Sequence, residues 1–292
     1  MPAHFKKVAI IGVGLIGGSL AMAMKHKRMA DTIVGIGRGT ANLELAMRLG
    51  VVDSIALDIE SGVAGADLVV VAVPVLKIGE TIKKAASGLT SPCIITDVGS
   101  VKKAIIDECE AALPEGITYV PGHPIAGTES SGVEAAMANL YNERVCILTP
   151  TSNTPQSDIG KIREMWQEAG SKVVIMDAAA HDRLLSAISH LPHIIAYTLV
   201  NTVAAAGEKN IDFLKYSAGG FRDFTRIASS SPEMWADVCA MNKDNIIGMI
   251  ENFQRQLEAL KRLMAHDDFK GVKANFEGAK KIRDSITTDA KK

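Results

Sequence analysis

The 292-residue sequence lacks several features that define other classes of protein. Its four cysteines, Cys93, Cys109, Cys146 and Cys239, are far apart and form no CxxC pair, which argues against a zinc site or a disulfide framework and favours a reducing compartment. The seven Phe, four Tyr and two Trp do not line up as a platform on which single-stranded nucleic acid could stack. No apolar run reaches the ~18 to 20 residues of a membrane span. We therefore expect a cytoplasmic protein.

An excess of charge of one sign is also missing. The 32 Lys and Arg nearly cancel the 33 Asp and Glu, so the chain has no global field that would hold a nucleic acid or an anionic membrane. With 47% hydrophobic and 22% charged residues, extended disorder is excluded. The length suits two domains, each with its own core.

One segment argues for export instead of the cytoplasm. Lys6 and Lys7, the apolar stretch from Val8 to Leu20 and the small residues Ala21 to Ala23 are similar to a secretory signal. Cleavage there would remove the best-formed strand and glycine turn of the chain, and no disulfide framework follows. We therefore favour the cytoplasmic interpretation.

Residues 1–177 alternate short apolar runs with helical patterns, which predicts an α/β domain with a doubly wound parallel sheet. The expected strands, rich in Val and Ile on both faces, are Val8–Ile11, Thr32–Ile36, Leu68–Val73, Cys93–Thr96, Thr118–Val120, Val145–Leu148 and Lys172–Met176. The expected helices are Gly17–Lys27, Asn42–Leu49, Leu76–Ala86, Val101–Ala112 and Gln156–Ala169.

Residues 178–292 show no strand-like runs, and we predict an all-helical second domain there. Ser231 and Pro232 mark a helix start, as N-cap and first helical residue. Apolar residues at near-heptad spacing between Ile246 and Met264 indicate either a core helix or a helix packed across a dimer interface. The stretch from Phe269 to Lys292 predicts a further amphipathic helix. A homodimer through this domain is our expectation.

A glycine turn, GxGxxG, lies directly after the first expected strand and directly before a helix. Gly12 permits the tight turn, Gly14 leaves room for a pyrophosphate, and Gly17 lets the helix and the strand pack closely. The helix N-terminus offers N–H groups and a partial positive charge to the phosphates. This context predicts a dinucleotide site, with Leu15 and Ile16 as further contacts.

The expected second strand ends without the carboxylate that usually binds the ribose 2′-hydroxyl. Arg38 follows it instead and could pair with a 2′-phosphate, with Thr40 as an additional hydroxyl donor. We therefore expect NADP to be accepted at least as well as NAD. An Arg38 side chain stacked on adenine or turned to solvent is the alternative. Val73 and Pro74, at the end of another strand, are expected to contact the cofactor.

Four polar clusters interrupt the apolar pattern, and the first two follow expected strands. Because the carboxyl ends of parallel strands form the ligand crevice of such a sheet, we expect Ser100 and His123 to face the nicotinamide. The later clusters would close the cleft from the helical domain. The clusters are Thr96–Lys102, Gly122–Glu129, Ser189–His193 and Gly219–Arg226.

Taken in order, the GxGxxG turn, DVGSVK, GHPIAGTESSGVE, SHLPH and GGFRDFTRIA followed by Met234 and Trp235 resemble the prephenate/arogenate (cyclohexadienyl) dehydrogenase family of tyrosine biosynthesis. The resemblance runs from residue 7 to about residue 265. It implies an NAD- or NADP-dependent oxidative decarboxylation that makes a ring aromatic. Some family members carry a fused chorismate mutase or an amino-acid-sensing domain, and we expect neither here.

The resemblance also implies roles for individual residues. His123 matches the catalytic histidine, and a neutral imidazole is a suitable acceptor for the ring hydroxyl proton. Ser100 matches the active-site serine; we expect its hydroxyl to fix the His123 tautomer, with a helix N-cap as the alternative. Arg226 matches the arginine that binds the ring carboxylate, for which its planar fork is suited. Arg222 is a weaker candidate of the same kind.

Further substrate contacts are expected from two of the clusters. In the family, the position of His193 faces the substrate and that of Ser189 lies near the side-chain carboxylate. Glu129 matches a residue that helps to gate the cleft, or is an exposed glutamate at a helix start, and we add its neighbour Thr128. The roles of Asp97 and Asp223 stay open.

His190 and His193, three residues apart near one face of a helix that Pro192 would kink, could suggest a zinc pair. No third ligand stands at a fixed spacing, and hydride transfer to a nicotinamide needs no metal, so we expect no metal site. For His190 a buried, hydrogen-bonded structural role is the favoured alternative.

Two other functions remain open from the sequence. A β-hydroxyacid dehydrogenase or a pyrroline-carboxylate reductase shares a Rossmann domain followed by helices, but these families typically use a lysine or other polar groups of the helical domain. A cofactor-sensing protein without turnover would not need His123. Prephenate and arogenate, which differ by a keto or an amino group on the side chain, are not distinguished.

Overall fold

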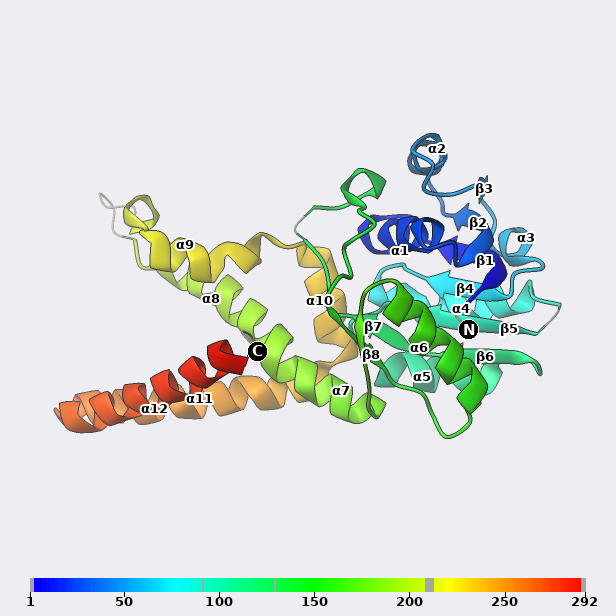
Figure 1. Cartoon of the computed structure of the whole chain (residues 1–292). Coiled ribbons are helices and arrows are strands. Elements are labelled where there is room, and N and C mark those ends of the chain that lie inside the picture. Colours follow the sequence, from blue (N-terminus) through cyan, green and yellow to red (C-terminus); the bar gives the residue numbers. More distant parts are fainter. Residues whose placement is uncertain (1–2, 91, 129, 208–212, 290–292) are drawn as a thin grey trace. The chain divides into compact units, whose positions relative to one another are not determined.

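The computed structural model describes residues 3–90, 92–128, 130–207 and 213–289. Their contacts divide the chain into two compact units, residues 1–243 and 244–292. The first unit contains both β-sheets and the helices up to α10, and the second consists of α11 and α12 (Figure 1). The domain boundary predicted near residue 177 stays a prediction.

The main sheet has six parallel strands in the order β3-β2-β1-β4-β5-β6. This is the strand order of a dinucleotide-binding fold, in which β1 and β4 flank the point where the order reverses. The expected α/β class is confirmed. The strands are β1 (Phe5–Ile11), β2 (Ala30–Ile36), β3 (Ser54–Ala56), β4 (Leu68–Val71), β5 (Cys93–Asp97) and β6 (Ile117–Val120).

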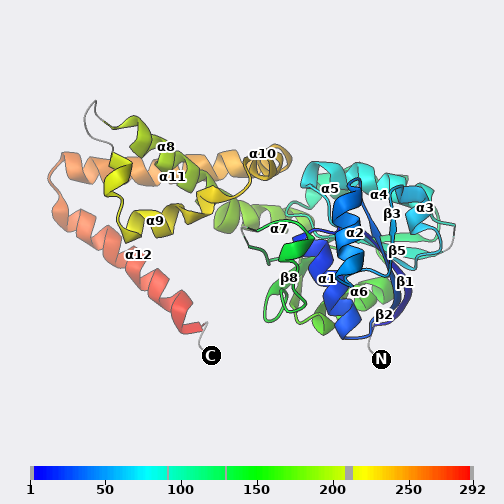
Figure 2. The ribbon, with the colours of Figure 1, turned by 90° about the horizontal axis from the view of Figure 1, so that it is seen from above.

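Helices cover both faces of this sheet, because alternate side chains of each strand point to opposite faces. In β1, Val8 and Ile10 belong to the core on one face, whereas Ala9 and Ile11 belong to the core on the other. Figure 2 shows α1 and α6 on one side of the sheet and α3, α4 and α5 on the other. The helices are α1 (Leu15–His26), α2 (Thr40–Arg48), α3 (Ile59–Val63), α4 (Ile78–Ser87), α5 (Lys103–Cys109) and α6 (Gln156–Glu168).

A second sheet of three strands corrects the prediction of a single sheet. Its order is β7-β8-β9, with β7 (Gly122–Pro124) antiparallel to β8 (Val145–Leu148) and β8 parallel to β9 (Lys172–Ile175). The sequence placed β8 and β9 in the parallel sheet because their apolar runs look the same there. β7, β3 and α3 were not predicted, because three to five residues are too few to show a period.

The rest of the first unit is helical. Ser186–His190 forms one π-helical stretch between α7 and α8, where we expected only a kink at Pro192, which lies in the first turn of α8. The Ser231 side chain accepts a hydrogen bond from Met234 N at 3.3 Å, which confirms the predicted cap. The helices are α7 (Ala178–Leu185), α8 (Leu191–Ala205), α9 (Gly219–Thr225) and α10 (Pro232–Met241), with 3-10 turns at Phe213–Tyr216 and Arg226–Ser229.

The second unit is a pair of helices, α11 (Lys243–Ala265) and α12 (Phe269–Asp289). Asp267, with φ of 55°, reverses the chain between them, and Asp268 caps α12 by accepting a hydrogen bond from Gly271 N. Both helices carry exposed apolar side chains, including Leu257 and Phe276. None of the helices in the described part of the chain is long and apolar enough to cross a membrane.

Candidate active site

The glycine turn joins β1 to α1 with the geometry that the sequence predicts. Gly12 has φ of +96°, and a Cβ on it would lie 2.2 Å from the Ala72 carbonyl oxygen. A Cβ on Gly17 would lie 2.2 Å from the Gly12 carbonyl oxygen, so the helix packs on the turn as closely as a backbone can. A Cβ on Gly14 would meet no atom within 4 Å. Gly14 is thus the one glycine of the motif with space in front of it.

That space belongs to a pocket of about 670 Å³ at the carboxyl ends of β1, β2 and β4. Gly14 is also the N-cap of α1, and it has no side chain to occupy the free N–H groups of the first turn. Gly12, Gly14, Arg38, Val73 and Pro74, all predicted cofactor contacts, line the pocket. The open N-terminus and the missing Cβ fit the pyrophosphate of a dinucleotide.

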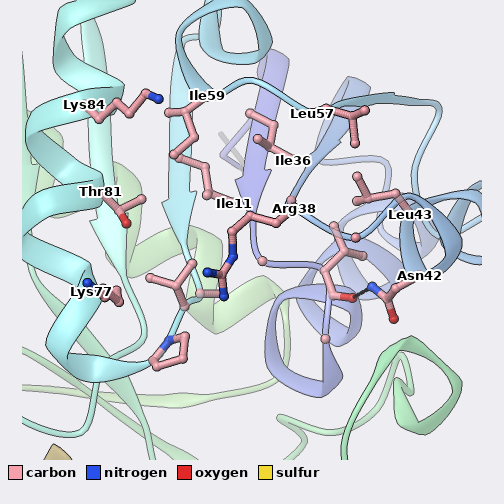
Figure 3. Close-up of a pocket in the computed structure, with 18 of the residues that line it drawn as sticks. Ile11, Ile36, Arg38, Asn42, Leu43, Leu57, Ile59, Lys77, Thr81 and Lys84 are labelled. Atoms are coloured by element: carbon pink, nitrogen blue, oxygen red, sulfur yellow. Dashed lines mark hydrogen bonds between the residues drawn. The ribbon is translucent and has the colours of Figure 1, made fainter.

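Three cationic side chains border this pocket. Figure 3 shows Arg38, just beyond β2, extending into it across from Lys77 and Lys84, which come from the segment Val75–Lys77 and from α4. Lys77 lies 3.3 Å from Glu80 and Lys84 lies 3.8 Å from Asp58, whereas no acidic side chain of the described residues pairs with Arg38. This side of the pocket therefore favours an anionic group.

The remaining predicted cofactor contacts lie next to the pocket lining. Leu15 is buried at the start of α1, and the Ile16 carbonyl accepts a hydrogen bond from the Tyr141 hydroxyl at 2.6 Å. Thr40 is exposed in the first turn of α2. The side chain of Asn42 bonds to the Val13 carbonyl at 2.8 Å and so holds the glycine turn against α2 (Figure 3).

At the end of β5, the buried carboxylate of Asp97 joins the loop that follows it to the strands β6 and β7. It forms an ion pair with Lys102 and accepts hydrogen bonds from the Tyr119 hydroxyl at 2.8 Å and from Gly122 N at 3.1 Å. Lys102 Nζ also donates to the Gly122 carbonyl at 2.8 Å. The loop that carries Ser100 is thereby fixed against the strand that carries His123.

His123 lies in β7 with only 9% of its surface exposed. Its Nδ1 is 2.8 Å from Nε2 of His181, and Nδ1 of His181 is 2.7 Å from Oδ1 of Asp182. Burial lowers the pKa of His123 well below the ordinary histidine value, and nearby His181, Lys102 and His190 lower it further. The ring is therefore neutral at physiological pH.

Ser100 is half-buried in the loop before α5. It is not the N-cap of this helix, which begins at Lys103; Asp182 instead accepts hydrogen bonds from Lys102 N and Lys103 N, both at 2.9 Å. Nδ1 of His123 faces His181, and the expected role of Ser100 in fixing the His123 tautomer stays a prediction.

Two predicted histidines gather around Trp235. His193 is half-buried and stacks on the indole with ring centroids 3.8 Å apart, and its Nδ1 donates to the Ser189 carbonyl at 2.9 Å. His190 is buried, its Nδ1 lies 3.2 Å from Asn242 Nδ2, and burial lowers its pKa to about 4. Among the described residues no group of His, Cys, Asp and Glu is arranged to hold a metal ion.

The other predicted substrate contacts lie in exposed positions. Arg226 is at the start of the 3-10 turn after α9, and the Arg222 Nε donates to the Ser217 hydroxyl at 3.3 Å. The Thr128 hydroxyl accepts a hydrogen bond from Ser130 N at 3.2 Å. Asp223 is exposed in α9, and Glu129 lies outside the described residues.

Sequence reasoning missed the residues behind His123. His181 and Asp182 are adjacent in α7, some 60 residues beyond His123, and no motif spacing connects them. The buried Lys102 was part of a quoted motif but received no role. The only signal in the sequence was that a histidine and an aspartate stand next to each other.

A pocket shaped for a dinucleotide and a buried, neutral histidine in the same compact unit are features of a nicotinamide-dependent dehydrogenase. The family model for "Prephenate dehydrogenase, nucleotide-binding domain" matches residues 20–175, and that for "Prephenate dehydrogenase, dimerization domain" matches residues 177–277. The chain belongs to the prephenate dehydrogenase family, whose members are oxidoreductases. This confirms the resemblance seen in the sequence.

Relatives match over nearly the whole chain. A cyclohexadienyl dehydrogenase of Zymomonas mobilis is 37% identical over 98% of this chain and 97% of its own length. A structure of prephenate dehydrogenase from Aquifex aeolicus in complex with hydroxyphenyl propionate and NAD+ has a TM-score of 0.91 at 35% identity, covering 96% of this chain and 98% of that one. An arogenate dehydrogenase from Synechocystis has a TM-score of 0.82 at 28% identity, covering 96% and 99%.

The glycine geometry predicts that two neighbouring substitutions act differently. Gly12→Ala should lower the free energy of unfolding by at least about 2 kcal/mol, because the new Cβ meets a backbone oxygen and φ is positive. Gly14→Ala should change stability by less than about 0.5 kcal/mol but weaken cofactor binding at least about tenfold, because its Cβ enters the pyrophosphate site.

Denaturant unfolding and titration with reduced cofactor, followed by fluorescence, measure the two effects. Gly160→Ala, in α6 and with no atom near its Cβ, is the matched control and should keep wild-type cofactor affinity. Unchanged cofactor affinity in the Gly14 variant would contradict the assignment of the pocket.

Proposed function

We propose that this protein catalyses the oxidative decarboxylation of prephenate, arogenate or both, with hydride transfer to NAD or NADP, in tyrosine biosynthesis. The observation that carries the proposal is the neutral imidazole of His123, buried in β7, whose Gly122 is hydrogen-bonded to Asp97 at the end of β5. The full-length similarity to cyclohexadienyl, prephenate and arogenate dehydrogenases supports it.

The residues suit the chemistry of such a substrate. Neutral His123 accepts the proton of the ring hydroxyl as the carbonyl forms. The nicotinamide, when bound, supplies the acceptor for the hydride. The bond between the opposite ring carbon and its carboxylate then breaks, carbon dioxide leaves, and the electron pair makes the ring aromatic with a phenolate oxygen. His123 returns its proton to this oxygen, so the substrate chemistry releases no net proton.

The other predicted residues bind and orient the substrate. Ser100, fixed near His123 through Asp97, is assigned to the substrate hydroxyl. Arg226 is assigned to the ring carboxylate and His193, held by the Ser189 carbonyl and Trp235, to the substrate face. We assign supporting contacts with the substrate to Ser189, Thr128, Glu129 and Arg222.

Reduction of the cofactor, followed by absorbance, tests this function directly. Prephenate and arogenate are each offered with NAD and with NADP, and a comparison of kcat/KM ranks them. We expect turnover with at least one pair, and a loss of about 10² to 10⁴ in kcat for His123→Asn. If neither substrate reduces either cofactor, the proposed function is wrong, and a β-hydroxyacid dehydrogenase or a cofactor sensor takes its place.

The cationic side of the pocket favours NADP at least as much as NAD. Arg38 should contact the 2′-phosphate, so Arg38→Ala should reduce the ratio of kcat/KM for NADP to that for NAD by about tenfold, the worth of one charge-assisted hydrogen bond. Arg48→Ala, exposed in α2, is the control. An Arg38 that stacks on adenine would weaken both cofactors equally. A wild-type preference for NAD of a hundredfold or more would contradict the proposal.

The proposed role of Arg226 predicts that its substitution changes KM more than kcat. It binds a carboxylate that leaves as neutral carbon dioxide, so it should stabilise the bound substrate more than the transition state. Arg226→Ala should therefore raise KM at least about tenfold while kcat falls less than about threefold. Arg163→Ala, exposed in α6, serves as the control. A loss confined to kcat would overturn this role.

We also propose a homodimer in the cytoplasm. The match to a dimerization domain over residues 177–277 and the exposed apolar side chains of α11 and α12 support the dimer. All four cysteines are free and three of them are buried, in keeping with a reducing compartment.

A further inference from the structure

His123 is the outer member of a buried row of three side chains. His181 lies behind it with no exposed surface, and Asp182 behind His181 with 3% exposed. The two hydrogen bonds of the row, 2.8 Å and 2.7 Å long, join nitrogen to nitrogen and nitrogen to oxygen. We call these three residues the histidine relay.

The direction of both hydrogen bonds follows from the inner end of the relay. The Asp182 carboxylate accepts backbone hydrogen bonds from Lys102 and Lys103, so toward His181 it is again an acceptor. Nδ1 of His181 must then carry the hydrogen, and a ring with this single hydrogen has a lone pair on Nε2. Nδ1 of His123 donates to that lone pair.

The consequence is a single tautomer for His123. With its hydrogen on Nδ1, its Nε2 is unprotonated, and this atom makes no hydrogen bond with any described residue. Building on the proposed function, we propose that His181, held by Asp182, is a positioning residue that keeps Nε2 of His123 free to accept the substrate proton and spreads the resulting positive charge toward Asp182.

Several hydrogen bonds hold Asp182 in place. Its carboxylate accepts the N–H groups at the start of α5, and its backbone carbonyl accepts a hydrogen bond from the Asn242 side chain at 2.8 Å. The same carboxylate thus orders the helix after the Ser100 loop and orients the ring behind His123. Movement of either element would disturb the other.

The surroundings of His123 disfavour a positive charge on its ring, so a path that spreads this charge toward a carboxylate is useful. Burial is the main opposition to a positive charge on His123 and lowers the pKa of this histidine. The ring of His181, Lys102 from the Ser100 loop and His190 from the π-helical stretch lower this pKa further. Cys146 of β8 is buried, and its thiol pKa is raised by burial, so it supplies no countercharge. Asp97 is engaged by Lys102, Tyr119 and backbone N–H groups. Asp182 is the carboxylate in line with the ring.

The proton balance of the reaction agrees with a closed relay. The proton that leaves the substrate hydroxyl returns to the same oxygen once the ring is aromatic. His123 therefore holds the proton for part of one cycle and needs no exchange with solvent, which a buried row ending at Asp182 would not provide.

A matched pair of substitutions separates the two hydrogen bonds of His181. His181→Gln places an amide oxygen near the Nε2 position and so keeps an acceptor for His123. His181→Asn places its amide near the Nδ1 position, so it keeps the hydrogen bond to Asp182 and loses the acceptor for His123. We expect kcat to fall by about 10² or more in the Asn variant and at least about tenfold less in the Gln variant, with KM changed by less than about threefold in both.

Ser186→Ala, a buried position just after α7 whose hydroxyl bonds to the Arg183 carbonyl, is the control for local packing and should keep wild-type kcat. Thermal unfolding of each variant shows that it is folded. Equal losses in the Gln and Asn variants, or an Asn variant with more than a third of wild-type kcat, would overturn the proposal.

The tautomer can also be observed without turnover. Nitrogen-15 chemical shifts of the histidine rings in the full chain should show the hydrogen of His123 on Nδ1, and Asp182→Asn, whose amide can donate, should move it toward Nε2. An Nε2–H tautomer in the wild type would overturn the relay. If this tautomer is confirmed but no substrate is turned over, the proposed function fails and the relay stands.

Discussion

The active site depends on the interactions of one buried carboxylate, that of Asp97. It stands at the carboxyl end of β5 with no exposed surface, and it gathers Lys102, the Tyr119 hydroxyl and the N–H of Gly122. A buried carboxylate is costly unless it is paired and hydrogen-bonded, so separating the loop and the strands that supply these partners is unfavourable. The loop carries Ser100, and one of the strands, β7, carries His123.

Asp182 repeats this arrangement from a helix distant in sequence. Its side chain accepts two N–H groups at the start of α5 and one hydrogen from His181. The start of α5 and the helix α7 are thus joined by a carboxylate that lies away from solvent. A positively charged His123 is disfavoured by burial, and this row of residues offers it a carboxylate at a distance of one ring.

Much of the fold followed from the pattern of the sequence. Apart from β3 and α3, the strands of the large sheet and the helices around it repeat apolar residues with periods long enough to recognise, and the glycine turn is defined by neighbours in sequence. The second sheet was missed because a short apolar strand looks the same in either sheet, and β7 is only three residues long. His123 and Arg38 were found because local motifs mark them. His181 was not, because its partner is 58 residues away.

The sequence by itself determined the family, the glycine turn, the sheet class and the identity of the histidine suited to proton transfer. Each of these depends on residues close together in the chain or on an ordered set of motifs. Only the tertiary structure decided which nitrogen of His123 faces His181, which residue begins α5 and which cations line the pocket. Hydrogen-bond direction and desolvation depend on atoms brought together by folding, and no local pattern in the chain records them.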